Sequence, residues 1–319
     1  MGSRGWLSVA STILPDAGDA RCEHVTASGT IAAAGGTPAR RRKGHQAVTP
    51  RVSVVTTVYN GEPYFDRAVP GILGQTYTDF EWILVDDGST DRTPEFLEEL
   101  ARRDARVQVH SPGRLGLTAA ANYGVSKATG EFIARQDFDD RSYPERLKLQ
   151  VAFLDAHPDV GVVGGYYVLI DERRGERYLR MPPTEHREIL TAMARYIPMA
   201  NTIVTFRRKV WSDAGGYPDV ADLEDLRLWL QAAKLGWRFA NLDQPIGEHY
   251  VHDTSFFHRS FKYVDRQRDL ARLQAKIVRE LGLPSWMYLF AVGRYAYAYL
   301  PRGLKRAVRR QIGAGERDI

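Results

Sequence analysis

The sequence predicts an α/β fold in which a doubly wound, mainly parallel sheet carries helices on both faces. Short apolar runs alternate with helical patterns from residue 50 to about residue 260, which is the order typical of such sheets. The first run, Val52–Val58, is rich in β-branched residues, as buried strands are. Acidic clusters follow two of the runs, and doubly wound sheets bind their ligands at the carboxyl ends of strands.

The remaining elements follow the first strand in alternation. Further strands are expected at Trp82–Val85, Val107–Val109, Phe132–Ala134 and Gly161–Ile170. Helices are expected at Phe65–Leu73, Glu95–Ala101, Thr118–Ala128 and from Pro144 to Leu154. Thr93 and Pro94 resemble a helix N-cap and a first-turn proline, and Gly130 is placed to end the third helix.

Composition indicates a globular protein with one disordered end. Hydrophobic residues make up 44% of the 319 residues and charged residues 26%. The single cysteine, Cys22, excludes an intrachain disulfide and a cysteine-based metal cluster, which favours a reducing, cytoplasmic setting. Residues 1–48 are rich in Gly, Ala, Ser, Thr and Pro and show no apolar period, so a disordered extension is expected there.

Charge is distributed unevenly along the chain. The net charge of +5 divides into +3 for residues 1–48, −6 for residues 49–261 and +8 for residues 262–319. An acidic body does not suggest nucleic-acid binding, whereas a basic amphipathic helical tail suggests an anionic surface as partner. Trp286–Leu300 is too short to span a bilayer and precedes Lys305, Arg306, Arg309 and Arg310. The pattern fits a helix in the membrane interface, and equally a helix packed on the core with a solvated basic face.

The two acidic clusters are the candidate chemistry of the sheet. Asp86 and Asp87 precede Gly88 and Ser89, and this cluster has an alternative explanation as a simple turn. The second cluster, Asp137-Phe138-Asp139-Asp140, places three carboxylates within four residues, which repel one another unless a cation or donors compensate. Hard oxygen ligands suit Mg²⁺ or Mn²⁺. No P-loop or dinucleotide fingerprint is present.

Several motifs, in order along the chain, resemble those of family 2 glycosyltransferases. The first half of the resemblance consists of Val52–Gly61, Gln75-Thr76-Tyr77, Trp82–Asp91, Asn122, Ala128–Ala134, Asp137–Asp140 and Pro144–Leu147. The second half consists of Gly215-Gly216-Tyr217, Leu223-Glu224-Asp225 and Leu228-Trp229-Leu230. The resemblance covers about residues 50–260, so the catalytic domain is expected at residues 49–261 and a helical tail at residues 262–319.

The resemblance implies a GT-A fold and the inverting transfer of a sugar from a nucleotide-diphosphate sugar to an acceptor hydroxyl. Thr57 and Tyr59 match positions that hold and stack on the donor base. Asp87 matches the position that hydrogen-bonds this base, with Asp86 beside it. Asp137 matches the ribose contact.

The resemblance also implies a divalent metal, Mn²⁺ or Mg²⁺, and a catalytic base. Asp139 matches the metal-binding acid of an Asp-x-Asp motif, with Asp140 as a less favoured substitute. His252 resembles a late histidine that reaches the metal or the diphosphate in related enzymes. Asp225 matches the catalytic base, which takes the proton of the attacking hydroxyl.

Structural explanations of three of these residues stay open. Tyr59 is also a candidate core aromatic, although it follows a strand and precedes Asn60 and Gly61, a turn at the ligand edge. Asp225 is also a candidate first-turn acid that favours the helix dipole, and His252 a candidate surface or packing residue.

Two other classes of protein stay open as well. One is a nucleotide-sugar-binding module without catalysis, against which the intact Asp139 and Asp225 argue. The other is a sugar-phosphate nucleotidyltransferase. Such enzymes usually have a Gly-rich, basic loop after the first strand, whereas here no Lys or Arg occurs between Tyr59 and Arg67.

The sequence also bears on partners and location. We expect a nucleotide-diphosphate sugar as donor, a glycan or lipid-linked acceptor, and a role in cell-surface glycan or polysaccharide synthesis. Through its tail the enzyme is expected at the inner face of the cell membrane, or otherwise free in the cytoplasm. Arg227 and Gln136 depart from the residues usual in the family. No apolar run is long enough to span a membrane, and this favours the addition of single sugars over processive synthesis.

Overall fold

The computed structural model describes residues 49–220, 222–253, 263–301 and 304. The predicted extension 1–48 and the cluster of Lys305, Arg306, Arg309 and Arg310 lie outside the described residues. No helix in the described ranges combines the length and the apolarity needed to cross a membrane.

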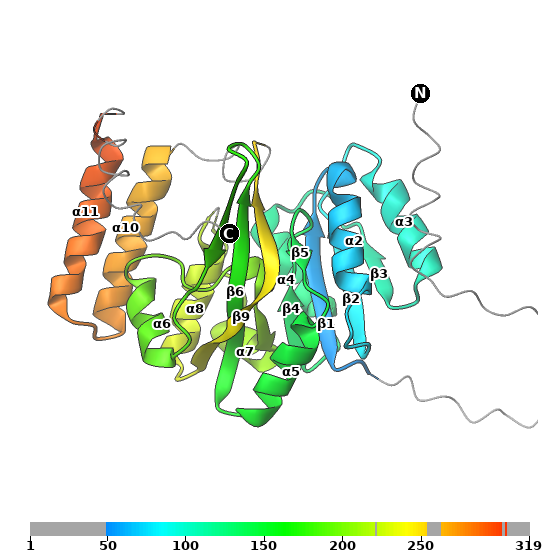
Figure 1. The fold of residues 1–319 in the computed structure, drawn as a ribbon, viewed down its shortest axis with the longest axis horizontal. Coiled ribbons are helices and arrows are strands. Elements are labelled where there is room, and N and C mark those ends of the chain that lie inside the picture. The colour runs from blue at the N-terminus through cyan, green and yellow to red at the C-terminus, as the bar shows by residue number, and fades with distance from the viewer. Residues whose placement is uncertain (1–48, 221, 254–262, 302–303, 305–319) are drawn as a thin grey trace, which may run out of the picture. The chain divides into compact units, whose positions relative to one another are not determined.

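The first half of the sheet consists of four parallel strands. They are β1 (Val52–Val58), β2 (Phe80–Asp86), β3 (Val107–His110) and β4 (Phe132–Arg135), in the spatial order β3-β2-β1-β4 (Figure 1). The register pairs Val58 with Asp86 and Val55 with Arg135, so the carboxyl ends of β1, β2 and β4 meet at one edge of the sheet. The strand order reverses at β1, where a doubly wound sheet opens a crevice.

The second half of the sheet is mixed. Its strands are β8 (Thr205–Arg207), β6 (Val160–Asp171), β9 (Arg238–Val251), β5 (Arg141–Ser142) and β7 (Glu176–Arg180). Strand β8 is antiparallel to β4 and β6, β9 is parallel to β6, and β5 and β7 are antiparallel to β9 and β6. Six of the nine described strands therefore share one direction, and the predicted mainly parallel sheet is confirmed.

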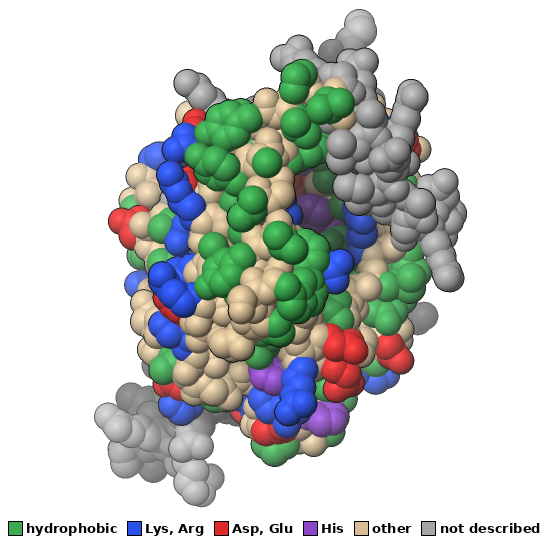
Figure 2. All heavy atoms as spheres, turned by 90° about the vertical axis from the view of Figure 1, so that its left-hand side faces the viewer, with side chains coloured by type: hydrophobic (Ala, Val, Ile, Leu, Met, Phe, Trp, Pro, Cys, Tyr) green, Lys and Arg blue, Asp and Glu red, His purple; other side chains and the backbone are tan. Residues whose placement is uncertain are grey.

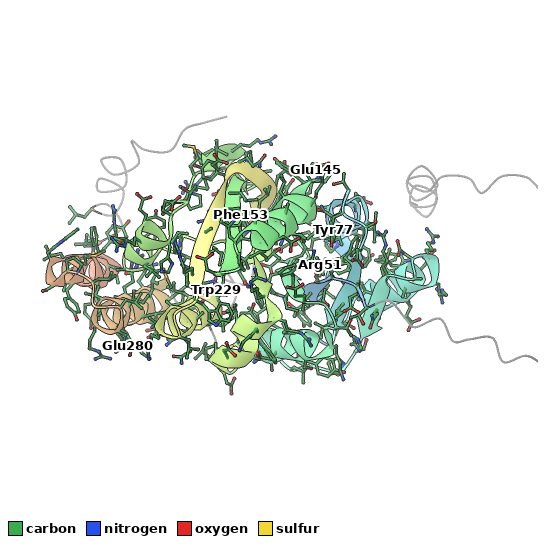
Figure 3. All side chains as sticks on the ribbon, turned by 90° about the horizontal axis from the view of Figure 1, so that it is seen from below. Arg51, Tyr77, Glu145, Phe153, Trp229 and Glu280 are labelled. Carbon is green, nitrogen blue, oxygen red and sulfur yellow. The ribbon has the colours of Figure 1, made fainter. Side chains whose placement is uncertain are left out.

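Helices cover both faces of the sheet, as predicted. One face carries α2 (Phe65–Leu73), α3 (Thr93–Arg103) and α5 (Arg146–Ala156), and the other carries α4 (Leu117–Lys127), α6 (His186–Met193), α7 (Arg208–Ala214) and α8 (Glu224–Lys234). Val54 and Val55 alternate between the two hydrophobic clusters, because successive strand side chains point to opposite faces. Phe153 and Trp229 lie on opposite sides of the sheet (Figure 3).

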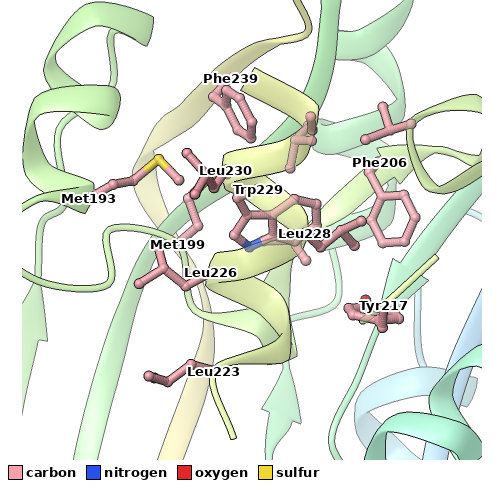
Figure 4. Close-up of a cluster of buried hydrophobic side chains, with 14 of the residues drawn as sticks. Met193, Met199, Phe206, Tyr217, Leu223, Leu226, Leu228, Trp229, Leu230 and Phe239 are labelled. Atoms are coloured by element: carbon pink, nitrogen blue, oxygen red, sulfur yellow. The ribbon is translucent and has the colours of Figure 1, made fainter. Parts of the chain in front are cut away.

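The larger hydrophobic cluster extends beyond the sheet to the C-terminal helices. Trp229 of α8 packs in it with Phe206 and Phe239 at ring-centroid distances of 5.6 and 6.3 Å (Figure 4). Helix α10 (Tyr263–Glu280) adds four buried side chains to the same cluster: Leu270, Leu273, Ile277 and Val278. Helix α11 (Tyr288–Tyr299) follows a short 3-10 turn, η3 (Ser285–Met287), and packs on α10. The division between residues 261 and 262 stays a prediction.

Two expectations about helix ends are wrong. Helix α4 ends at Lys127 with Ala128 as its C-cap, so Gly130 does not close it. Helix α3 begins at Thr93, so Arg92 and not Thr93 occupies the N-cap position. The Thr93 hydroxyl instead accepts a hydrogen bond of 2.7 Å from the N–H of Gly61, in the turn that leads from β1 to α2. The Thr93 hydroxyl therefore forms a tertiary hydrogen bond with Gly61 in place of the helix-capping hydrogen bond that was expected.

Candidate active site

The turn after β1 lies at the edge where the parallel strands end. Asn60 has a left-handed φ of 53°. Its N–H donates to the Ser89 hydroxyl at 2.9 Å, and its side-chain oxygen accepts from the N–H of Thr90 at 2.8 Å. A Cβ on Gly61 would come within 2.4 Å of a methyl group of Val58, so this turn requires glycine there. The motifs after β1 and β2 therefore form one interlocked pair of loops.

Tyr59 projects from this turn and is 45% exposed, which contradicts its alternative explanation as a core aromatic. The guanidinium carbon of Arg114 lies 3.7 Å from the centre of its ring. Arg114 also forms an ion pair with Asp87, with 3.0 Å between Nη1 and Oδ2. An exposed aromatic ring beside a buried carboxylate and an arginine offers a stacking surface together with hydrogen-bonding groups.

The two acids at the end of β2, Asp86 and Asp87, make different contacts. The Asp86 carboxylate is buried and accepts the N–H of Ser89 at 3.0 Å, which shapes the turn. The Asp87 carboxylate accepts the N–H groups of Leu115 at 2.6 Å and Gly116 at 3.0 Å, and so fastens the loop that begins α4. Thr57 is half-buried near the end of β1.

The acids after β4 divide into one that is enclosed and two that reach the surface. Asp140 is 1% exposed and accepts the N–H of Tyr250 at 2.7 Å, while its Oδ2 lies 2.9 Å from Nδ1 of His249. Although burial opposes it, the charge of Asp140 helps to raise the pKa of His249 to about 9. The Asp139 side chain is 30% exposed. The contacts of Asp140 with β9 thus occupy its carboxylate, and Asp139 is the carboxylate available to a ligand.

Asp139 faces His252, with 2.9 Å between Oδ2 and Nε2. The other ring nitrogen of His252 lies 3.2 Å from the Tyr64 hydroxyl, which orients the imidazole. Arg67 donates to the backbone oxygen of Asp139 at 2.9 Å and stacks on Tyr250, its guanidinium carbon 3.5 Å from the ring centre. The pair is therefore fixed from both sides.

The residues present fit a hexacoordinate divalent cation in part. Two neighbouring ligands of an octahedral ion, each about 2.1 Å from it, lie about 3.0 Å apart, and Asp139 and His252 are 2.9 Å apart. Among the described residues no group of three His, Cys, Asp or Glu side chains is placed to hold an ion. The protein would thus supply two ligands, and a substrate or water would complete the shell, as Mg²⁺ sites commonly arrange.

A buried arginine lies beneath Asp137. Arg135 is 1% exposed, donates to the carbonyl of Val55 at 2.7 Å and lies 3.3 Å from Oδ1 of Asp137. Burial raises the pKa of Asp137, and the charge of Arg135 opposes that rise. A second buried arginine, Arg146, donates to the carbonyl of Arg135 at 2.6 Å.

Asp225 stands at the first turn of α8. Leu223, the residue directly before the helix, has a left-handed φ of 61°. Burial raises the pKa of Asp225 to about 6 and that of Glu224 to about 8, and the charge of Asp137 adds to both shifts. The charge of Asp137 therefore acts on Asp225 although the two carboxylates lie on different elements.

The loop that precedes α8 is fixed by another motif residue, Asn122 of α4. Its side chain accepts the N–H of Tyr217 at 2.9 Å and donates to the Tyr217 carbonyl at 2.8 Å. It also accepts the indole N–H of Trp211 at 3.0 Å. Asn122 therefore joins α4 to α7 and to the loop before α8.

The structure brings the predicted site residues together in three groups. Tyr59 and Asp87 are joined through Arg114, Asp139 pairs with His252, and Asp137 acts on Asp225. Sequence reasoning missed Arg114, Arg67 and Arg135. Of these, only Arg114 had a sequence signal, because it lies between Gly113 and Gly116 in the loop after a predicted strand.

The sheet order, the helices on both faces and the acidic site at the carboxyl edge define a GT-A type fold. The fold is shared with solved glycosyltransferase structures. TarS of S. aureus, residues 1–349 in complex with UDP-GlcNAc, gives a TM-score of 0.60 at 19% identity, over 78% of this chain and 72% of that one. The mannosyltransferase PcManGT of Pyrobaculum calidifontis, in complex with GDP-Man and Mn²⁺, gives a TM-score of 0.57 at 22% identity, over 83% of this chain and 81% of that one.

Sequence comparison identifies the family. The family model described as glycosyl transferase family 2 matches residues 53–212. EpsE of Bacillus subtilis (strain 168) is 34% identical over 79% of this chain and 90% of its own length. The amylovoran biosynthesis glycosyltransferase AmsE of Erwinia amylovora is 31% identical over 70% of this chain and 85% of its own length. The chain belongs to glycosyltransferase family 2, as its motifs predicted.

Proposed function

We propose that this glycosyltransferase transfers a sugar, with inversion at the anomeric carbon, from a nucleoside-diphosphate sugar to an acceptor hydroxyl. The observation that carries the proposal is the electrostatic effect of Asp137, just after β4, on Asp225 of α8. Burial, together with this and other nearby charges, gives Asp225 a pKa of about 6. A base with such a pKa is ionised at neutral pH and still basic enough to accept a proton.

The donor nucleotide lies along the edge formed by β1, β2 and β4. Its base stacks on Tyr59 and hydrogen-bonds Asp87, with Thr57 and Asp86 shaping this end of the crevice, and its ribose meets Asp137. In support, Tyr59 is exposed beside Arg114, and Asp137 is the half-buried acid at the next strand end. Two structural neighbours were solved with nucleotide sugars, UDP-GlcNAc and GDP-Man.

Asp139 and His252 hold the divalent cation, Mn²⁺ or Mg²⁺. Their spacing of 2.9 Å and their fixed orientation support this role. A bound cation supplies positive charge that neutralises the leaving diphosphate. One structural neighbour was solved with Mn²⁺.

The reaction step uses Asp225 as general base. The acceptor hydroxyl gives its proton to the Asp225 carboxylate while its oxygen forms a bond to the anomeric carbon. The bond from that carbon to the diphosphate oxygen breaks on the opposite face, and its electron pair stays on the diphosphate. No covalent sugar–enzyme intermediate is needed, so the configuration inverts.

The acceptor is a glycan or lipid-linked precursor of a cell-surface polysaccharide. The support is the set of relatives named for amylovoran and O-antigen biosynthesis. The tail, residues 262–319, holds the enzyme at the anionic inner face of the membrane, where such precursors lie. Its net charge of +8 supports this position.

A donor screen with product stereochemistry tests the proposal. The full chain is incubated with nucleotide sugars and Mn²⁺, first without acceptor and then with simple glycosides. We expect slow hydrolysis or transfer from one class of donor, and proton NMR of the product should show the opposite anomeric configuration to the donor. Retention of configuration would overturn the mechanism. Donor binding without hydrolysis or transfer would favour a binding module, and pyrophosphate-dependent release of nucleoside triphosphate a nucleotidyltransferase.

A further inference from the structure

Helix α11 lacks the charged outward side of an ordinary surface helix. Its one charged residue, Arg294, points toward the body of the protein. The guanidinium donates to the side-chain oxygens of Gln274 and Gln267, both at 2.9 Å, and to the carbonyl of Arg195 at 2.8 Å. A helix between a protein core and water carries its charged residues on the other side.

The outward side of α11 and of the preceding turn is apolar. Leu289 and Val292 are 69% and 63% exposed, and Ala291 and Ala298 are the buried side chains of the helix. We call the exposed set the outer face of α11: Trp286, Tyr288, Leu289, Val292, Tyr295 and Tyr299. Of the twelve large hydrophobic side chains exposed in the described ranges, seven lie between residues 286 and 304. Such concentration marks an interaction surface, whereas scattered exposed residues would not.

Helix α11 adjoins a groove along α6. Phe290 of α11 lies under the guanidinium of Arg195, 4.8 Å from ring centre to carbon. Arg195 also lines the groove, together with Arg187, one acid, Glu188, and the exposed Met181. Figure 2 looks onto the side of the molecule that carries α11, and hydrophobic side chains gather there beside a column of Lys and Arg. The surface is therefore apolar at its centre and cationic at its margin.

We infer that the outer face of α11 is a membrane-binding surface that lies in the headgroup–acyl boundary of an anionic bilayer. The inference rests on the proposed function only for the membrane's biological role, since lipid binding itself needs no catalysis. Trp and Tyr side chains are enriched at this depth of a bilayer. Residues 302–310 contribute five basic side chains to the sequence directly after α11, which complements an anionic surface.

A second copy of the chain fits the surface less well. A helix of twelve residues is about 18 Å long and about 10 Å wide. One face of that size buries a few hundred Å², whereas a stable dimer needs about 800 Å² from each partner. The cationic margin on both copies would also repel. An anionic bilayer does not require that buried area, and it attracts the cationic margin.

Flotation of the full chain with lipid vesicles tests the inference. The probe is vesicles of phosphatidylcholine with phosphatidylglycerol, compared with phosphatidylcholine alone. We expect binding to the anionic vesicles that weakens at high salt. Leu289→Glu should reduce it about tenfold or more, because it places a charge where a leucine side chain leaves water. Leu235→Glu is the matched control, since Leu235 is 49% exposed at the end of α8 and is not part of the outer face of α11. This variant should bind vesicles as the unmodified chain does.

Two further measurements make each outcome decisive. Circular dichroism melting should be the same for both variants, which separates lost binding from lost folding. Equal vesicle binding by both variants would overturn the inference. So would a dimer in sedimentation velocity without lipid that Leu289→Glu dissociates. Nucleotide binding by calorimetry should be unchanged in Leu289→Glu, so failure of the membrane inference and failure of the proposed function are distinguishable.

Discussion

Oδ2 of Asp139 lies 2.9 Å from Nε2 of His252, although 113 positions separate the two residues in the chain. Strand pairing brings them together. Arg141 of β5 pairs with Glu248 of β9, so the loop after β4 and the end of β9 are held side by side. Asp140 reinforces the contact through the N–H of Tyr250. Two short segments of unlike sequence thus create one candidate metal site.

Asp139→Ala should abolish the metal dependence of donor binding. Removing the carboxylate leaves His252 as the one remaining proposed ligand of the cation, which is too few to hold it. Calorimetric titration with the nucleotide sugar, with and without Mn²⁺, measures this. The unmodified chain should bind more tightly with Mn²⁺, whereas the variant should give one affinity under both conditions. A metal-dependent gain that persists in Asp139→Ala would contradict the assignment.

Asp225→Asn should leave donor binding nearly intact and lower kcat by about 10²–10⁴, the usual contribution of a general base. In the unmodified enzyme kcat should rise with pH and level off above about 6, since burial raises the pKa of Asp225 to about 6 and only the ionised form accepts a proton. Steady-state kinetics across pH measures both effects. Asp243→Asn, which alters an exposed carboxylate of β9, should retain full activity. Full activity of Asp225→Asn would show that another group takes the proton.

Tyr59→Ala should weaken nucleotide binding by about tenfold, since stacking of a base on an aromatic ring contributes about 1–3 kcal/mol. Tyr59→Phe keeps the ring and should bind as the unmodified protein does. Both variants should melt at the same temperature, because the side chain is 45% exposed. Titration with the nucleoside diphosphate measures the affinity, and equal affinities for all three proteins would exclude the stacking role.

Glu224→Gln should stabilise the protein at alkaline pH and have little effect near pH 5. Burial raises the pKa of Glu224 to about 8, so the folded state holds a proton that the unfolded state releases near its ordinary pKa of about 4.5. The stability of the unmodified protein therefore falls as pH rises between these values. Glutamine resembles the protonated acid and removes this dependence.

Denaturant unfolding at several pH values measures the effect of Glu224→Gln. The gain in unfolding free energy should exceed about 1.4 kcal/mol at pH 8, the equivalent of one pKa unit. Glu95→Gln, at an exposed first-turn position of α3, is the control and should show no such gain. A pH-independent difference would mean that Glu224 is ionised in the folded protein.

The sequence by itself determined the architecture and the chemistry-bearing segments. Alternating apolar runs placed β1 at Val52–Val58 and α2 at Phe65–Leu73, with the boundaries that the structure has. Such local signals suffice because burial on both faces requires continuous apolar strands. The strand-end acids were also recognisable, since a parallel sheet gathers its carboxyl ends at one edge.

Only the tertiary structure decided which of these side chains are buried, which reach the surface and which partners they contact. Adjacent acids cannot be told apart by composition, yet the pairing of β9 encloses Asp140 and leaves the Asp139 side chain 30% exposed. Arg135 gave no signal in sequence, because an arginine in a strand is ordinarily expected at the surface and here it is buried beneath Asp137. The uncharged outer side of α11 could not be predicted from the sequence either. Periodicity shows that a helix has two sides, but which side meets the protein depends on the partners of Arg294, which come from residues far away in the chain.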